Sequence, residues 1–426
     1  MNVLFVNPPF VDKVNGVMRY GCRAGSRWPW SSAHNLSDYA PFPFFMAYAA
    51  SFLEKYGVQV GMYDSVAIRE INYDSFYRNV REMHPEIIVI ETSSPTIHID
   101  LQVAKKLSEI LPKSEIALSG PHSSVFAEEL IKLPYIRYVL KGEYEINSLE
   151  MWKTRRSGIY ECTLIKDIDS SPYPYRDPKV IAKYWDQAAR TPRPQLAVCA
   201  SRGCPFKCTF CMWMAVMYRG MHRLRDPKKV VEEVRYCVSE FGARSILFDD
   251  DSFNIGTDRI STLCDELKTI GIPWTMMGRL DTSPLWLFDK MIDCGCASMK
   301  FGVETFSSKL QKNIKKGLAP KTSKKVLMHF SKKHPRYPVK ISMIRNLPGE
   351  TEEDRQLDVR ILKEIGFDNT ASLRYQVVNC IPFPGTELYN KLVVLGHEKL
   401  LRDFSMYDGS PDRDNVLAKI VTEIMV

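Results

Sequence analysis

The chain has 426 residues, of which 45% are hydrophobic and 25% charged, and its formal net charge is +8. This composition is typical of an ordinary globular protein with two or three domains. The basic excess is modest for this length, so we expect a solvated basic surface and no nucleic-acid partner. The eleven cysteines lack the regular spacing of a disulfide framework.

The apolar segments of the sequence fit neither a signal peptide nor a membrane span. Residues 1–10 form an apolar stretch that includes two prolines, without the basic region and cleavage site of a signal peptide. The apolar run at residues 42–53 is too short to span a bilayer and is interrupted by proline and serine. We therefore expect no integral membrane segment and a cytoplasmic protein.

Residues 1–150 alternate apolar strands with helices. The strands are continuously apolar, which is typical of a parallel sheet covered on both faces. The pattern predicts a doubly wound, Rossmann-like α/β domain that binds ligands at the carboxyl ends of its strands. Strands are expected at 2–6, 58–63, 87–90, 116–119 and 138–140, and helices at 44–56, 75–83, 99–111 and 125–133.

Small and polar residues follow these strands. Small side chains allow a large planar ligand to approach the backbone, so this edge is a candidate binding site. A flavodoxin-like domain without a ligand is the alternative, because a fold does not determine a function. The candidate residues are Asn7, Thr92, Ser93, Ser94, Ser119, Gly120, Pro121 and His122.

Two irregular segments interrupt the alternation. Residues 11–43 form a long insert in which Arg23, Arg27 and Trp28 are candidates for substrate contact, although a flap packed by its own tryptophans is an equal alternative. Residues 151–194 are rich in proline, tyrosine and aspartate, and we expect a linker with a short hairpin at 160–166.

Residues 195–386 contain a second β/α series. Six such units predict a partial (β/α)6 barrel of the TIM type, with its active site at the carboxyl ends of the strands. Residues 387–426 are expected to form a short C-terminal segment. The expected strands are 195–200, 245–248, 274–277, 299–303, 339–344 and 373–378, and the expected helices are 226–241, 259–270, 285–293, 322–332 and 351–365.

Three closely spaced cysteines follow the first strand of this series. Cys204, Cys208 and Cys211 have the spacing C-x3-C-x2-C, which allows three thiolates to face one point and bind a soft metal centre. Three ligands leave one iron of a four-iron cluster open to another molecule. The alternatives are a zinc loop or free cysteines, but zinc usually takes a closed set of four ligands.

This loop resembles the cluster loop of the radical S-adenosylmethionine (SAM) enzymes. The match includes the apolar strand at 195–200 and the aromatic Phe210 just before the last cysteine. The resemblance implies that Cys204, Cys208 and Cys211 are catalytic and hold a 4Fe-4S cluster whose open iron binds SAM. It also implies cleavage of SAM to a 5′-deoxyadenosyl radical, with electrons from an external flavodoxin or ferredoxin.

Other strand ends match the same family. Glu304 lies in a Gly-x-Glu sequence whose glutamate binds the SAM ribose in the family, and the sequences L-P-G-E-T and P-F-P-G-T follow the fifth and sixth strands. Asp249 and Asp250 offer acceptors for the SAM ammonium group, unless they only cap a helix. Arg279 and Arg345 are candidates for the SAM carboxylate or a substrate anion.

The first domain resembles the cobalamin-binding domain of one class of radical SAM enzymes. The matching sequences are V-N-P-P-F, E-T-S-S-P-T, L-S-G-P-H-S-S and L-K-G-E-Y-E, which add Pro8, Gly142 and Glu143 to the candidate residues. The loop after the first strand lacks the histidine that ligates cobalt in many such domains. The resemblance is therefore to members that bind cobalamin without a protein histidine.

Together the two domains imply a cobalamin-dependent radical SAM C-methyltransferase. Its substrate would be an unactivated carbon of a small metabolite, natural product or lipid precursor, methylated through the 5′-deoxyadenosyl radical and methylcobalamin. One alternative is a cyclase, ring-contraction or oxidative enzyme that uses the same cofactors without methyl transfer. The other is a cobalamin or redox sensor, against which the intact Cys204, Cys208, Cys211 and Glu304 argue.

Overall fold

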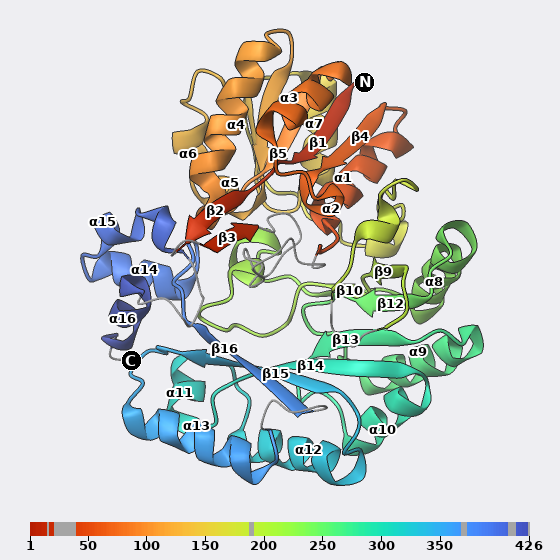
Figure 1. The fold of residues 1–426 in the computed structure, drawn as a ribbon, viewed down its shortest axis with the longest axis vertical. Coiled ribbons are helices and arrows are strands. Elements are labelled where there is room, and N and C mark those ends of the chain that lie inside the picture. Colours follow the sequence, from red (N-terminus) through yellow and green to blue (C-terminus); the bar gives the residue numbers. More distant parts are fainter. Residues whose placement is uncertain (15–16, 21–39, 187–190, 368–372, 408–414, 425–426) are drawn as a thin grey trace. The chain divides into compact units, whose positions relative to one another are not determined.

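The computed structural model describes the chain except for residues 15–16, 21–39, 187–190, 368–372, 408–414 and 425–426. The candidate substrate residues Arg23, Arg27 and Trp28 lie outside the described part. The chain divides into two compact units (Figure 1). The first unit comprises Met1–Asp186 with Ala215–Arg219, and the second comprises Gln187–Met214 with Gly220–Val426.

The first unit contains a six-stranded parallel sheet in the order β4-β1-β5-β6-β7-β8. Every residue of β1 and β5 is buried, as continuous apolar runs predict for a sheet covered on both faces. This confirms the predicted Rossmann-like sheet. The strands are β1 (Val3–Asn7), β4 (Val60–Asp64), β5 (Ile87–Glu91), β6 (Glu115–Ser119), β7 (Tyr138–Leu140) and β8 (Gly158–Tyr160).

Seven helices described in this unit surround the sheet (Figure 1), and α1 packs against α7. A short antiparallel pair, β2 (Val11–Val14) with β3 (Val17–Tyr20), follows β1. The helices are α1 (Phe44–Lys55), α2 (Ser65–Ile68), α3 (Tyr73–Glu82), α4 (Ile97–Ile110), α5 (Gly120–Val125), α6 (Ala127–Leu130) and α7 (Glu145–Thr154).

The segment expected to be a linker belongs largely to the first unit. Its residues Gly158–Tyr160 pair in parallel with β7 and form β8, so the expected hairpin at 160–166 is wrong. Ala40 and Trp185 form a β-bridge, and buried Ile168 and Tyr184 fix the segment further. Its sequence lacks periodicity because it packs through isolated side chains, not through a regular face.

The second unit is built on six parallel strands in the order β16-β15-β14-β13-β12-β9, the reverse of their order in the sequence. This arrangement confirms the predicted partial barrel. A two-stranded antiparallel pair, β10 (Ser201–Arg202) with β11 (Arg223–Leu224), lies beside it. The six strands are β9 (Gln195–Val198), β12 (Ser245–Phe248), β13 (Trp274–Gly278), β14 (Cys296–Glu304), β15 (Val339–Arg345) and β16 (Leu373–Asn379).

The helices of the second unit begin and end at residues suited to those positions. Asp226 caps α8 by accepting a hydrogen bond from Lys228 N, Pro227 opens the helix, and Gly242 ends it with a φ of 62°. In Figure 1, α9, α10, α12 and α13 lie along one side of the sheet. The helices are α8 (Pro227–Phe241), α9 (Thr257–Ile270), α10 (Leu285–Asp293), α11 (Ser308–Asn313), α12 (Pro320–Lys333), α13 (Glu352–Glu364), α14 (Glu387–Val394), α15 (Glu398–Leu401) and α16 (Val416–Thr422).

No helix in the described part of the chain is both long enough and apolar enough to cross a membrane.

Candidate active site

Cys204, Cys208 and Cys211 lie on a loop after β10 that backbone hydrogen bonds hold at both sides. Thr209 N donates to Ile314 O at 3.0 Å, and Thr209 O accepts from Leu388 N at 3.1 Å. Among the ten cysteines that the structure describes, these three and Cys162 are partly exposed, and the other six are buried. The three cysteines are therefore partly exposed residues on a fixed loop.

The thiols of this loop interact with one another electrostatically. Burial raises the pKa of Cys208 and raises that of Cys211 to about 12, and the neighbouring Cys204 acts in the same direction on both. Cys208 and Cys211, whose raised pKa values disfavour ionisation, need a positive partner to become thiolates. A cationic iron centre is such a partner, so the residues fit the cluster that the spacing predicts.

Asp250 holds the backbone that leads into the cysteine loop. Its carboxylate accepts hydrogen bonds from Ala200 N at 3.1 Å and from Ser201 Oγ at 2.5 Å, and burial raises its pKa to about 6. The neighbouring Asp251 accepts from Gly203 N at 3.2 Å. These contacts give Asp250 a positioning role that the sequence did not predict. Asp249 is partly exposed and remains a candidate for SAM.

Arg279, at the end of β13, supports the cysteine loop from its other side. Its guanidinium lies 3.5 Å from the ring centroid of Phe206, between the first two cysteines. Nε and Nη2 donate to the two carboxylate oxygens of Asp281 at 2.9 and 2.8 Å. The charge of Arg279 is therefore already paired, and its contact with a SAM carboxylate stays a prediction.

Glu304 ends β14 and forms a buried ion pair with Lys316. Lys316 Nζ lies 2.8 Å from Glu304 Oε1, and Ser342 Oγ donates to Glu304 Oε2 at 3.4 Å. Glu304 has a φ of 69°, and the pairing of β14 with β15 shifts register between Gly302 and Glu304. This shift turns the carboxylate back over the strand.

Gly302 explains the glycine of the Gly-x-Glu sequence. A Cβ at this position would lie 2.8 Å from Lys316 Nζ and would also collide with Glu304 Oε1. Glycine thus leaves room for the ion pair in its present geometry, and a larger residue would displace the ends of both charged side chains. The sequence pattern is therefore a packing requirement of the two charged groups.

Lys316 is the site residue that the sequence analysis missed. It follows α11 directly after Lys315, which is exposed and pairs with Glu387 at 2.7 Å. Burial acts to lower the pKa of Lys316, but Glu304 and Cys208 nearby raise it overall, so Lys316 is a buried cation. The sequence offers no signal that separates these two lysines except that only one of them precedes glycine.

The two remaining candidates of this unit lie at its surface. Phe210 is partly exposed on the cysteine loop, next to Cys211. Arg345 is exposed at the end of β15, and its carbonyl accepts a hydrogen bond from Cys380 N at 2.8 Å. The structure brings Cys208 into electrostatic range of Cys204, Arg279 and Lys316, and Arg345 is not among the groups that act on it.

In the first unit, Asn7 and Asp64 end the neighbouring strands β1 and β4. Asn7 Nδ2 donates to Asp64 Oδ1 at 2.8 Å, and Tyr184 OH donates to Asp64 Oδ2 at 3.1 Å. Asn7 Oδ1 is buried and has no hydrogen-bond partner among the described residues. Because β1 lies between β4 and β5, Asn7 is at the switch point where doubly wound sheets bind ligands.

The ends of β5 and β6 are tied together by short hydrogen bonds. Thr92 Oγ1 donates to Ser119 O at 2.8 Å, and Ser94 Oγ lies 3.0 Å from Nδ1 of the buried His122. Ser93 Oγ lies 2.9 Å from Thr96 Oγ1. The structure thus brings these candidates together at one edge, where they form hydrogen bonds with one another.

The glycines of this edge are required by their protein neighbours. A Cβ at Gly120, which has a φ of 91°, would lie 2.6 Å from Thr92 O, and a Cβ at Gly142 would collide with Cys162. The room that the sequence analysis assigned to a ligand beside Gly120 is filled by Thr92, so any ligand contact of Gly120 stays a prediction. The other candidates of this unit, Pro8, Pro121 and Glu143, are also buried.

Comparison with known proteins identifies the second unit. Residues 198–362 match the Radical SAM superfamily. An uncharacterized methyltransferase of Pyrococcus horikoshii is 26% identical over 378 residues, 82% of this chain and 77% of the relative. The anaerobic magnesium-protoporphyrin IX monomethyl ester cyclase of Cereibacter sphaeroides is 24% identical over 64% of this chain, and the match spans only 44% of the cyclase.

A solved structure has the same fold along most of the chain. The radical SAM methyltransferase TsrM from Kitasatospora setae, solved with cobalamin and a 4Fe-4S cluster bound, superposes with a TM-score of 0.67 and 13% sequence identity. The match covers 93% of this chain and 79% of TsrM, so it includes both units. The chain therefore contains a domain, at residues 198–362, that matches the Radical SAM superfamily.

Proposed function

We propose that the chain is a cobalamin-dependent C-methyltransferase that acts on an unactivated carbon of a small metabolite, natural product or lipid precursor. The observation that carries this proposal is the likeness to TsrM over 93% of the chain, which extends beyond the radical SAM domain through the first unit. A methyltransferase among the sequence relatives supports it.

The residues of the second unit fit a cluster and SAM. Cys204, Cys208 and Cys211 would hold the cluster, and Glu304 would accept hydrogen bonds from the ribose hydroxyls of SAM. When bound, these groups supply an electron and a source of a carbon-centred radical. The chain's own residues fix the geometry: Asp250 holds the loop backbone, Arg279 supports Phe206, and Lys316 holds the Glu304 carboxylate in place.

The first unit fits cobalamin through Asn7. The rim of a corrin ring carries amide side chains that donate N–H hydrogen bonds, and Asn7 Oδ1 is a buried acceptor in need of a donor. His122 is paired with Ser94 and lies against Phe126, with ring centroids 4.6 Å apart. We therefore propose that no histidine of this edge ligates cobalt.

A cyclisation without methyl transfer is the second candidate function, because the Cereibacter cyclase is a sequence relative. Both reactions need an external electron donor, for which we propose a flavodoxin or ferredoxin.

The products of SAM distinguish these functions. Anaerobic enzyme with cluster and cobalamin would be incubated with cell extract and SAM carrying an isotopically labelled methyl group. A methyltransferase gives S-adenosylhomocysteine, 5′-deoxyadenosine and a labelled product. A cyclase gives 5′-deoxyadenosine alone, and a sensor gives neither. Either of the last two results would reject the proposed methyl transfer.

Two asparagines at opposite ends of β1 test the cobalamin site. Asn7→Ala removes the orphan acceptor, whereas Asn2→Ala breaks hydrogen bonds to Gln59 and Glu86 at the amino end of the strand. We expect lower cobalamin loading, measured by absorbance after gel filtration, in the Asn7 variant only. Equal loading in both variants would remove Asn7 from the site.

A further inference from the structure

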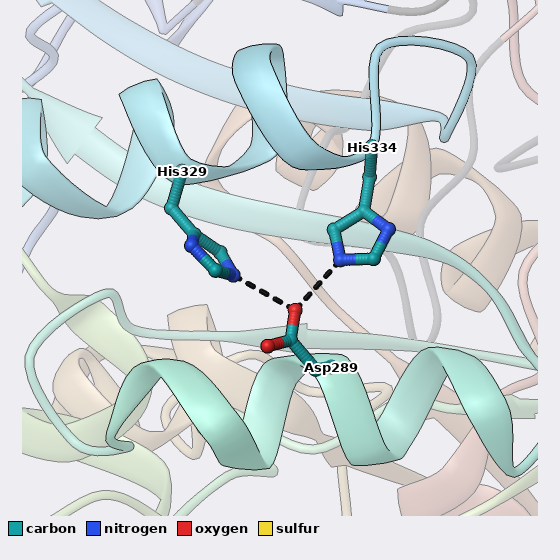
Figure 2. A group of neighbouring side chains, drawn as sticks. All are labelled: Asp289, His329 and His334. Atoms are coloured by element: carbon teal, nitrogen blue, oxygen red, sulfur yellow. Dashed lines mark hydrogen bonds and ion pairs between the residues drawn. The ribbon is translucent and has the colours of Figure 1, made fainter.

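Asp289, His329 and His334 form a compact cluster in the outer helical layer of the second unit. Asp289 lies on α10, His329 lies on α12, and His334 is the residue at which α12 ends. Figure 2 shows both imidazole rings directed at the same carboxylate oxygen. Asp289 Oδ1 lies 2.8 Å from His329 Nε2 and 2.6 Å from His334 Nε2.

This cluster is separate from the radical SAM site. His334 lies shortly before β15 begins, at the amino-terminal edge of the sheet, whereas Glu304 lies at the carboxyl-terminal edge of β14. Among the residues that the structure describes, no other set of three histidine, cysteine or acidic ligand atoms lies within 4.8 Å of one another. We propose that these three residues bind a divalent transition metal ion, Zn²⁺ in the first place.

The donor set selects the class of metal. Two imidazole nitrogens and one carboxylate oxygen are typical ligands of zinc, with water in the fourth position, whereas calcium and magnesium prefer oxygen alone. Ligands at about 2.0–2.1 Å from zinc are roughly 3.3 Å apart in a tetrahedron. The present contacts of 2.6 and 2.8 Å would have to open only slightly.

Each imidazole binds a metal through Nε2 once the proton on that nitrogen is lost. Metal binding requires the tautomer with its proton on Nδ1. Without a metal, each Nε2–H donates to Asp289 Oδ1, so a metal on the two Nε2 atoms takes the place of these two protons. Neither Nδ1 has a hydrogen-bond partner in the described part of the chain, so each Nδ1 can carry the remaining ring proton when the metal is bound. All three side chains are only 17–19% exposed, which limits competition from water without closing the site.

Lys333 is the nearest competing cation. Its Nζ lies 2.7 Å from Asp289 Oδ2, the oxygen that the histidines do not contact. The lysine side chain is 56% exposed and can move into solvent. A metal on Oδ1 and the ammonium group on Oδ2 therefore use different oxygens of one carboxylate.

The metal would join α10 to α12. These helices already contact each other through Phe288 and Phe330, whose ring centroids are 5.5 Å apart. A bound ion would add a second link at the solvent side of that contact. Its role is structural, because an ion that binds only the folded chain stabilises it by mass action.

The test uses the whole chain without a histidine tag and with its 4Fe-4S cluster in place, so that Cys204, Cys208 and Cys211 are not available to bind zinc. After dialysis against micromolar Zn²⁺, metal analysis should find one zinc per wild-type chain, with a raised melting temperature. His329→Gln and His334→Gln should each weaken zinc binding by more than about tenfold. Lys333→Ala is the matched control, because it breaks an equally short contact with Asp289 without removing a ligand. It should keep the zinc.

X-ray absorption of zinc-loaded wild-type protein gives a second readout that needs no variant. The proposal requires nitrogen and oxygen at about 2.0–2.1 Å and no sulfur at about 2.3 Å. Sulfur ligation, absence of zinc, or equal zinc in wild type and both histidine variants would overturn it. The last result would mean that Asp289, His329 and His334 form only an ion-paired group.

Discussion

Lys316 Nζ lies 2.8 Å from Glu304 Oε1 in a pair whose side chains are 9% and 7% exposed. A buried charge is costly unless it is paired, so each of the two residues depends on the other. Gly302 leaves room for the pair in its present geometry, and the backbone of Glu304 is left-handed with a φ of 69°. The end of β14 is therefore shaped around one ion pair at the proposed SAM site.

Lys316→Met should destabilise the second unit by about 3–5 kcal/mol, because it leaves Glu304 buried without its cation. Lys315→Met removes an exposed ion pair with Glu387 and should cost only about 0–1 kcal/mol. Urea unfolding of both variants measures the difference. Similar midpoints for the two variants would show that the buried pair contributes no more than the exposed one.

Replacing Cys204, Cys208 or Cys211 with alanine should each abolish the iron content and the reductive cleavage of SAM. The loop contains only these three cysteines, so a lost ligand cannot be replaced by another thiolate of the loop. Cys199→Ala and Cys162→Ala are the controls, since Cys199 is buried and Cys162 lies outside the loop. Iron analysis after anaerobic reconstitution decides the matter, and retention of the full iron content in any of the three loop variants would contradict the assignment.

Local signals predicted much of the fold. The strand expected at 245–248 and the helix expected at 285–293 have the same bounds in the structure. Both are set by short-range features: an apolar run of strand length in the first case and a helical apolar period after Pro284 in the second. The β/α alternation predicted the two parallel sheets, although it did not give the order of their strands.

Long-range contacts account for what the sequence did not reveal. Strand β8 has only three residues in a proline-rich segment and exists because it pairs with β7. Lys316 differs from Lys315 only through its burial against Glu304. The sequence predicted Asp250 as a SAM ligand because of its place after the second strand. Its hydrogen bonds go to Ala200 and Ser201, which lie about 50 residues earlier in the chain, so local sequence could not predict them.

Asp64 should make the first unit less stable as the pH rises from about 4 to about 6. Burial raises its pKa from 3.8 to about 6, so the folded state binds the proton more tightly than the unfolded state in this window. Stability from this group is thus present at the acidic end and is lost as the pH passes its folded pKa. The contribution of Asp64 to the free energy of unfolding should fall by on the order of 3 kcal/mol across this window.

Asp64→Asn isolates this contribution. Asparagine is neutral and caps a helix about as well as aspartate, so it can still accept from Val66 N and Ala67 N. The difference in urea midpoint between the variant and wild type should change across the window in favour of the variant as the pH rises. Asp250 and Asp358, whose pKa values are also raised to about 6, cancel in this comparison. A difference that does not vary with pH would refute the prediction.

Glu304→Ala should leave the cluster intact and weaken SAM binding by roughly tenfold or more. A carboxylate that accepts hydrogen bonds from the ribose hydroxyls contributes about 1.5–3 kcal/mol for each charged hydrogen bond, and about 1.4 kcal/mol corresponds to a factor of ten. Glu304→Ala alone also leaves Lys316 as an unpaired buried cation, which lowers stability. The double variant Glu304→Ala with Lys316→Met removes both charges and separates the two effects. It should recover stability in urea without recovering SAM affinity in equilibrium dialysis. If the double variant binds SAM as wild type does, Glu304 acts only as the partner of Lys316 and does not contact SAM.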